Sequence, residues 1–444
     1  MTLFMDALKT YFKAHQLMLT PEIEYCKDYS QLPPISPLCV VFVESTEDVL
    51  YLVKLANEYA IPLITRGAGT GKAGGSIPDE NGVVVSLERM DRIQNIDHIN
   101  RTITVEPGVI LSDLQQAISQ EGLWYPVDPA SAEWCTIGGN VACNAGGPRA
   151  LKYGVTGDYV IGIKGVYGDG TFFQLGGKLR KDVAGYDLKR LLIGSEGTLA
   201  IITSITLRLL PPPPPEQVIW CGFDCISDGI DFLIAVLSQN LQPTAAEFMP
   251  RVCIKAVESY HKTQYPFSHY AAHLLLVLDA SHELNFSTLP PCHRVQFEDQ
   301  ASLWKIRRDI SESLTHVSLS KCSEDITVPV SQLPALMRGL QRLTDQTDYI
   351  CLGYGHLGDG NVHVNVLNTD QPIEKWHIDK PYIVERIIKL GISLGGTLSG
   401  EHGIGLTKKP FMPLYFSERD IAIMKGIKAQ FDPNHILNPS KVFD

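Results

Sequence analysis

The stretch LGYGHLGDGNVHVNVL, residues 352–367, predicts a β-hairpin. Two runs of alternating apolar residues flank Asp359-Gly360, a dipeptide typical of two-residue type I′ hairpin turns. Pairing outward from that turn places His356 directly opposite His363, with Cβ atoms about 4.5–5.5 Å apart. The three valines of the second run point to the opposite face. The hairpin should therefore bury its valines and present two imidazoles on the other side.

A second unusual stretch, GGTLSGEHGIG at residues 395–405, presents Glu401 and His402 on a Gly-rich turn. Two imidazoles and a carboxylate, with an open position, form the usual donor set of a catalytic divalent metal. His402 would then be available as a base. The alternative is a pair of histidines on a half-exposed sheet that binds no metal.

Size and composition narrow the class of protein. A chain of 444 residues is long enough for two or three domains, and its net charge of -11 argues against a nucleic-acid partner. The apolar runs are shorter than a membrane span, and the first 19 residues lack the features of a secretory signal. Ten cysteines without a C-x-x-C pair indicate a reducing compartment. We expect a cytoplasmic protein, either free or peripheral at the inner face of the membrane.

The stretch Arg66–Ser76 is rich in glycine and follows a predicted strand. Gly69, Gly71 and Gly74 satisfy G-x-G-x-x-G, but the loop leads into another strand, whereas the dinucleotide fingerprint must open a helix. Such a loop can still aim consecutive backbone N–H groups at a phosphate. The alternative interpretation is a plain flexible turn.

Two further segments organise the chain. Residues 136–147, TIGGNVACNAGG, have no strong helix or strand period, and their small side chains suggest backbone lying against a large flat ligand. Residues 211–215 are five consecutive prolines, which form a stiff polyproline II spacer and predict a domain boundary. Alternating strand and helix patterns follow, including one helix over 303–314, and predict a smaller α+β domain.

Six motifs occur in one order along the chain: the Gly-rich loop, TIGGN…NAGG, GYDLKRLLIGSEGTLAIIT, GHLGDGNVHVNV, SGEHGIG and FDPNHILNPSKV. Together they resemble the FAD-linked D-2-hydroxyacid dehydrogenase family of the vanillyl-alcohol-oxidase/PCMH flavoprotein superfamily, which includes glycolate oxidase catalytic subunits, D-lactate dehydrogenases and D-2-hydroxyglutarate dehydrogenases. The resemblance implies an α+β fold. Residues 1–215 would form a PCMH-type FAD-binding domain of two subdomains, residues 216–400 a cap domain with a ferredoxin-like antiparallel sheet and the metal site, and residues 401–444 a segment returning to the FAD-binding domain.

The resemblance also implies FAD held without a covalent link, with its pyrophosphate on the Gly-rich loop. The expected FAD-binding residues are Arg66, Gly67, Ala68, Gly69, Thr70, Gly71, Gly74, Ser76, Pro129, Ser131, Thr136, Ile137, Gly138, Gly139, Asn140, Cys143, Ala145, Gly147, Gly154, Glu196, Gly197, Ile201 and Asn438.

The family's metal ligands correspond to His356, His363 and Glu401, and Zn²⁺ is the expected ion, with Mn²⁺ or Fe²⁺ as alternatives. By the same resemblance His402 is the proton acceptor. The implied reaction is metal-assisted oxidation of a small D-2-hydroxy acid, D-lactate or glycolate, to the 2-oxo acid. Hydride passes to flavin N5, and a quinone, a cytochrome or an electron-transfer flavoprotein accepts the electrons instead of NAD. The residues expected to contact the substrate are Arg307, Asn365 and Ser311.

One departure from the family bears on the substrate. D-2-hydroxyglutarate enzymes carry a Lys for the distal carboxylate where this chain has Ser323, followed by Glu324-Asp325. This disfavours a second substrate carboxylate, although Lys321 could compensate. The alternatives are a D-2-hydroxyglutarate dehydrogenase, a flavin-binding subunit active only in a larger complex, and a metal-dependent hydrolase, which would leave the Gly-rich loops unexplained. A homodimer or an assembly with partner subunits fits the family equally well.

Overall fold

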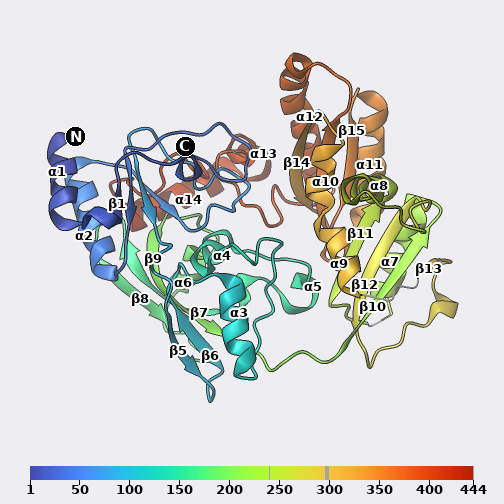
Figure 1. Ribbon diagram of the computed structural model, residues 1–444, viewed down its shortest axis with the longest axis horizontal. Helices are drawn as coiled ribbons and strands as arrows, with labels where there is room; N and C mark the ends of the chain where they lie inside the picture. Colours follow the sequence, from blue (N-terminus) through green and yellow to red (C-terminus); the bar gives the residue numbers. More distant parts are fainter. Residues whose placement is uncertain (240, 296–299, 444) are drawn as a thin grey trace. The chain divides into compact units, whose positions relative to one another are not determined.

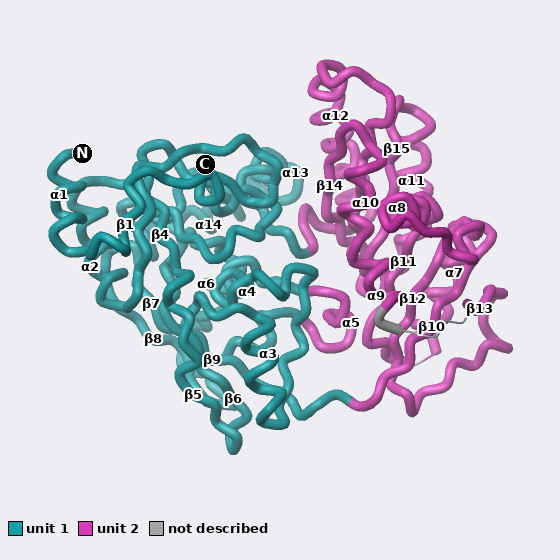
Figure 2. Tube along the Cα trace, viewed as in Figure 1, with its two compact units in different colours: residues 1–146, 155–213, 401–444 teal, residues 147–154, 214–400 magenta. Residues whose placement is uncertain are grey.

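A computed structural model describes residues 1–239, 241–295 and 300–443, which divide into two compact units (Figure 2). Unit 1 comprises Met1–Gly146, Val155–Pro213 and Glu401–Asp444, and unit 2 comprises Gly147–Gly154 and Pro214–Gly400. The main division falls inside the proline run. Within the described residues, no helix combines the length and the apolar character needed to cross a membrane.

Unit 1 begins with a sheet of order β1-β2-β4-β3, in which β2, β4 and β3 run parallel and β1 is antiparallel. Its inner strands are continuous apolar runs, as expected for a parallel sheet buried on both faces. The hydroxyl of Ser45 accepts a hydrogen bond from the Asp48 N–H and so caps the helix that follows β2. The elements are α1 (Thr2–Tyr11), β1 (Leu17–Met18), β2 (Cys39–Phe42), α2 (Thr46–Tyr59), β3 (Leu63–Arg66) and β4 (Val83–Ser86).

The second sheet of unit 1 is antiparallel, with the order β5-β6-β9-β7-β8 (Figure 1). Its apolar face packs with α3 and α4 into one core. The C-terminal segment belongs to the same unit, because Leu437 pairs with Leu63 beside the first sheet. The elements are β5 (Ile93–Asp97), β6 (Thr102–Val105), α3 (Leu111–Gln120), α4 (Ile137–Cys143), β7 (Val160–Tyr167), β8 (Phe172–Gly176), α6 (Leu188–Leu192), β9 (Ala200–Arg208), α13 (Met412–Tyr415) and α14 (Glu418–Phe431).

The helix α4 corrects the expectation of irregular backbone over 136–147. Thr136 caps it, because its Oγ1 accepts a hydrogen bond from the Gly139 N–H at 3.2 Å. Asn144 then ends the helix in the left-handed conformation, with φ of 52°. Two glycines in the first turn weakened the periodic signal, but the capping residue and the left-handed terminus define the helix.

Unit 2 contains two antiparallel sheets, of order β11-β12-β10-β13 and β14-β16-β15. A bridge between Phe248 and Gly355 joins β11 to the end of β15. Helices α11 and α12 pack on one side of the three-stranded sheet, against Gly353 and Ile326 (Figure 1). The elements are α5 (Ala150–Tyr153), β10 (Glu216–Phe223), α7 (Ile226–Leu237), β11 (Ala245–Pro250), α8 (Arg251–His261), β12 (Ala272–Asp279), β13 (His293–Val295), α9 (Gln300–Arg308), α10 (Ile310–His316), β14 (Ser320–Thr327), α11 (Leu333–Gln346), β15 (Ile350–Tyr354), β16 (Asn361–Asn368) and α12 (Ile373–Ser393).

Two details of unit 2 differ from the sequence-based expectation. The single helix expected over 303–314 is divided into α9 and α10 at Asp309, whose carboxylate binds His261 of α8 at 2.7 Å. The short segment containing α5 groups with unit 2, although it was expected in the first domain. Ion pairs from Arg149 to Glu216 and from Lys152 to Asp279 hold it there.

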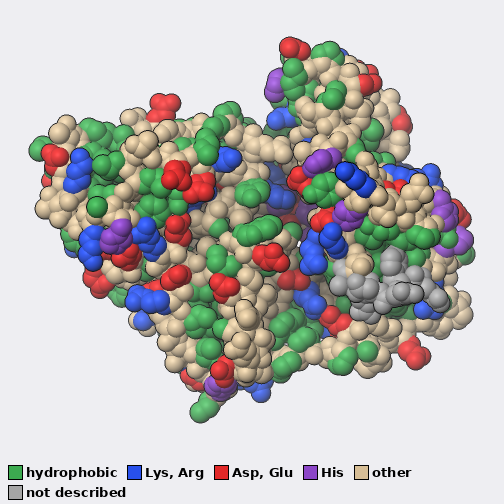
Figure 3. Space-filling view, in the orientation of Figure 1, with side chains coloured by type: hydrophobic (Ala, Val, Ile, Leu, Met, Phe, Trp, Pro, Cys, Tyr) green, Lys and Arg blue, Asp and Glu red, His purple; other side chains and the backbone are tan. Residues whose placement is uncertain are grey.

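Charged side chains of both signs are interspersed on the visible face of each unit (Figure 3).

Candidate active site

The hairpin that carries the two histidines forms, but in a different register from the one expected. His363 pairs with Tyr354, and a 3₁₀ turn over Leu357–Asp359 replaces the two-residue turn. Gly355, with φ of 124°, leaves the ladder and exchanges backbone hydrogen bonds of 2.9 and 3.0 Å with Phe248 of β11. The tertiary contact with β11 thus overrides the local preference of Asp359-Gly360 for a tight hairpin.

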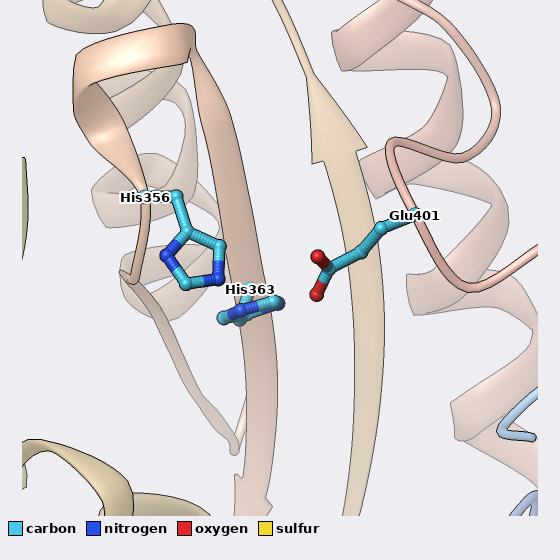
Figure 4. A group of neighbouring side chains, drawn as sticks. All are labelled: His356, His363 and Glu401. Atoms are coloured by element: carbon cyan, nitrogen blue, oxygen red, sulfur yellow. The ribbon is translucent and has the colours of Figure 1, made fainter. Parts of the chain in front are cut away.

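The two histidines are nevertheless neighbours, with ring centroids 5.1 Å apart. One ligand atom each from His356, His363 and Glu401 lies within 4.8 Å of the other two, and Figure 4 shows these side chains converging. Glu401 directly follows Gly400, the last residue of unit 2. His356 is buried and the other two side chains are half-buried. This donor set suits Zn²⁺, Mn²⁺ or Fe²⁺.

Sequence reasoning missed Glu247, which lies on β11 directly before Phe248. Its side chain is completely buried; Oε1 accepts a hydrogen bond from His356 Nδ1 at 2.6 Å, and Oε2 accepts one from Arg307 Nε at 2.5 Å. Burial raises the pKa of this carboxyl group, but the charges of Arg307 and His356 outweigh that effect and lower it to about 2. A lone glutamate in the apolar run AAEFMP was the available signal, because an unpaired buried carboxylate is unfavourable.

The predicted substrate-contacting residues all lie in unit 2, and Arg307 binds this carboxylate directly. The Arg307 guanidinium is 5.3 Å from the centre of the Tyr354 ring, and Tyr354 is the cross-strand partner of His363. Asn365 follows on the same face of β16, is fully buried, and its Oδ1 makes no hydrogen bond with the described residues. Ser311, at the start of α10, accepts a hydrogen bond from the Lys321 ammonium through its carbonyl oxygen at 2.5 Å.

A second buried carboxylate anchors the loop that leads to Glu401. Asp325 of β14 pairs in register with His363 and accepts hydrogen bonds from Asn361 Nδ2 at 2.5 Å and from Ser399 Oγ at 3.0 Å. Ser399 lies two residues before Glu401 in the chain. The loop is therefore anchored to the sheet immediately before it delivers the carboxylate.

Within unit 1, His402 lies beside Glu401, with Nε2 3.5 Å from Glu401 Oε1. The turn that follows is held by Glu196, whose two carboxylate oxygens accept the Ile404 and Gly405 N–H groups at 2.7 and 2.8 Å. Burial raises the pKa of Glu196 despite these two hydrogen bonds. Glu196 was predicted to bind FAD. Its observed contacts hold the turn after His402, and its contact with FAD remains a prediction.

The predicted FAD-binding loops meet inside unit 1. A Cβ atom at Gly67 would lie 2.3 Å from Thr136 Oγ1, so the Gly-rich loop and the start of α4 approach more closely than any side chain would allow. A Cβ atom at Gly197 would contact Thr65 and Asn438. Thr65 Oγ1 and Asn438 Oδ1 are buried and lack hydrogen-bond partners among the described residues. Close backbone approach and unpaired polar atoms fit a site for a large polar cofactor such as FAD.

The remaining predicted FAD-binding residues have diverse surroundings. Arg66 is buried and donates hydrogen bonds to the carbonyl groups of Lys27 and Glu24 at 2.8 and 2.7 Å. A Cβ atom at Gly71 would meet no atom within 4 Å. Gly147 and Gly154 belong to unit 2. The individual contacts of these residues with FAD remain predictions.

Comparison with known proteins identifies the family of this chain. Residues 37–176 match the family described as FAD binding domain, and residues 212–442 match the family described as FAD linked oxidases, C-terminal domain. The chain therefore belongs to the FAD-linked oxidases, and the resemblance drawn from the six motifs is confirmed.

Curated relatives extend over most of this chain. It is 35% identical to glycolate oxidase subunit GlcD of Bacillus subtilis, over 92% of this chain and 89% of the relative. It is 36% identical to a D-lactate dehydrogenase of Archaeoglobus fulgidus, over 91% and 90%. It is 33% identical to a D-2-hydroxyglutarate dehydrogenase of Xanthomonas citri pv. viticola, over 95% and 92%. These matches support the assignment of this chain as an FAD-linked enzyme that oxidises hydroxy acids.

Among solved structures, p-cresol methylhydroxylase with substrate bound superposes with a TM-score of 0.78 at 16% identity, covering 100% of this chain and 97% of the other. An alkyldihydroxyacetonephosphate synthase gives 0.76 at 19% identity, covering 99% and 86%. At this identity the likeness concerns the fold alone, and it confirms the predicted PCMH-type, α+β architecture.

Proposed function

We propose that this chain oxidises a small D-2-hydroxy acid, D-lactate or glycolate, to the corresponding 2-oxo acid, with FAD and a divalent metal as cofactors. The observation that carries the proposal is the convergence of His356, His363 and Glu401. When bound, FAD supplies a hydride acceptor, and the metal supplies a Lewis acid that makes the 2-hydroxyl group more acidic. Zn²⁺ is the ion we expect.

The residues around the metal ligands suit a 2-hydroxy acid. Arg307 makes one hydrogen bond to the described residues, from Nε to Glu247, so its two Nη groups can bind the substrate carboxylate in bidentate form. Asn365 Oδ1 is buried, has no hydrogen-bond partner in the part of the chain that the structure describes, and can accept a hydrogen bond from a substrate donor. His402, beside Glu401, takes the proton of the 2-hydroxyl group at a ring nitrogen.

Apart from its carboxylate, the substrate should carry only a small, uncharged group on the carbon that bears the hydroxyl group. Ser323 pairs in register with Asn365, at the position where the family's D-2-hydroxyglutarate enzymes place a lysine. Glu324 adds negative charge to the same strand. The Lys321 ammonium, the cation nearest in sequence, is bound to the carbonyl oxygen of Ser311. These features favour D-lactate or glycolate, and D-2-hydroxyglutarate is the alternative.

The electrons then pass to an acceptor other than NAD, for which a quinone, a cytochrome and an electron-transfer flavoprotein are the candidates. A chain that requires partner subunits for this second half-reaction would still reduce its own flavin. Flavin reduction therefore tests the proposed oxidation separately from the choice of acceptor.

Anaerobic mixing of the purified, FAD-containing protein with D-lactate, glycolate, L-lactate and D-2-hydroxyglutarate tests the proposal. We expect loss of flavin absorbance with D-lactate or glycolate and none with L-lactate. Reduction by D-2-hydroxyglutarate in preference to both would support the alternative substrate. If none of the four acids reduces the flavin, the proposed function is wrong.

A further inference from the structure

Glu247 is a fully buried carboxylate, and its burial has to be offset by stabilising partners. It lies on β11 with no exposed surface, between strand neighbours that are apolar. A buried carboxylate is unfavourable unless charged or hydrogen-bonding partners surround it. Its partners are His356 and Arg307, which come from separate segments of the chain and have different roles in the proposed site.

The contact with His356 determines which ring nitrogen can bind a metal. Glu247 Oε1 lies 2.6 Å from Nδ1, so Nδ1 carries the proton and donates it to the carboxylate. The other nitrogen, Nε2, points toward His363 and Glu401 (Figure 4). A carboxylate behind a metal-binding histidine fixes the tautomer and the ring orientation, and its loss typically lowers metal affinity about 10–100-fold.

The contact with Arg307 determines how the guanidinium is presented. Glu247 Oε2 accepts the hydrogen bond from Nε at 2.5 Å, and the Tyr354 ring lies beneath the guanidinium, 5.3 Å from its central carbon. Because Nε is engaged, the edge that carries both Nη groups is the one left to meet a carboxylate. One side chain therefore orients both a metal ligand and the predicted anchor for the substrate.

The backbone of β11 is itself fixed to the metal hairpin. Phe248, the residue after Glu247, exchanges both backbone hydrogen bonds with Gly355, the residue before His356. The positions of the Glu247 carboxylate and of the His356 ring are thus set by one backbone pairing as well as by their direct hydrogen bond.

We infer that Glu247 is a positioning residue that links the metal site to the substrate-carboxylate site, through His356 on one oxygen and Arg307 on the other. This inference rests on the proposed function, because it assigns Glu247 a role in holding that metal and that substrate. A simple structural ion pair would stabilise the fold, and its loss would leave metal affinity unchanged.

The variant Glu247→Gln keeps the shape of the side chain and removes its charge. The matched control is Glu258→Gln on α8, because Glu258 is also buried in unit 2 and binds Lys255 and the Tyr265 N–H. Each full-length protein is stripped with a chelator and titrated with Zn²⁺ alone, well below its melting temperature. FAD content and the KM and kcat for the hydroxy acid are measured on the reloaded proteins.

We expect Glu247→Gln to lower Zn²⁺ affinity about 10–100-fold and to raise KM for the hydroxy acid, with FAD content unchanged. Glu258→Gln should change neither. Wild-type Zn²⁺ affinity and KM in Glu247→Gln would overturn the inference while leaving the proposed function standing. If Glu247→Gln does not fold, the same measurements are made on Glu247→Asp, which keeps the charge but is too short to reach both partners. Wild-type Zn²⁺ affinity and wild-type KM in Glu247→Asp would then overturn the inference. If the wild-type protein binds no divalent metal, the proposed function and the inference fail together.

Discussion

The backbone at Gly355 links the fold to the metal site, and a single methyl group tests this link. The φ of 124° at Gly355 is strained for any residue with a side chain, and holding alanine there costs about 1–3 kcal/mol. A Cβ atom at this position would lie 2.7 Å from His363 Cδ2 and 3.3 Å from its Nε2. The hydrogen bonds to Phe248 hold the backbone in place, so the imidazole ring has to move.

We therefore expect Gly355→Ala to lower the free energy of unfolding of unit 2 by about 1–3 kcal/mol. Displacing one of three ligands should also lower Zn²⁺ affinity by about tenfold or more. Chemical denaturation followed by tryptophan fluorescence measures the first effect, and competition with a chromophoric chelator measures the second.

The control for this experiment is Gly426→Ala on α14. A Cβ atom at Gly426 meets no atom within 4 Å, so alanine should stabilise the helix by up to about 1 kcal/mol and leave Zn²⁺ affinity unchanged. A Gly355→Ala protein with wild-type stability and wild-type Zn²⁺ affinity would refute the reasoning about this backbone.

Three further predictions concern the base, the pH dependence of stability and the substrate. His402→Ala should slow flavin reduction by about 10²–10⁴-fold in stopped-flow mixing with FAD still bound, and near-normal reduction would exclude the role of base. Burial lowers the pKa of His273 to about 4, so the unfolded chain takes up the proton first and stability falls as pH drops from about 6.5 to 4. The loss amounts to about 3 kcal/mol in urea unfolding and should be absent in His273→Gln. Ser323→Lys should raise kcat/KM for D-2-hydroxyglutarate relative to D-lactate about tenfold or more, and an unchanged ratio would contradict the proposal that position 323 sets the substrate preference.

Sequence patterns predicted much of the architecture because local signals and tertiary structure agree there. The strands on either side of the Gly-rich loop and the spacer at 211–215 follow from residue chemistry alone. The three valines of the hairpin are fully buried, as their alternation predicts. The set of His356, His363 and Glu401 was identified by residue type and then brought together by the fold.

The errors at the metal hairpin and at Glu247 fall where a distant segment decides the local geometry. Asp359-Gly360 favours a tight turn, but the pairing of Gly355 with Phe248 shifts the register by tertiary contact. The role of Glu247 depends on two partners that are distant in sequence, at positions 307 and 356, and no local pattern connects them. A single glutamate in an apolar strand signals an unusual burial, but only the structure identifies the groups that neutralise it.

The central claim is that a metal held by His356, His363 and Glu401 assists the oxidation of a hydroxy acid by the FAD-containing chain. The most direct measurement is the rate of anaerobic flavin reduction by D-lactate or glycolate, before chelation, after chelation and after Zn²⁺ is restored. The account predicts that chelation abolishes reduction while FAD stays bound, and that Zn²⁺ restores it. Undiminished reduction in protein shown to be free of metal would contradict the account.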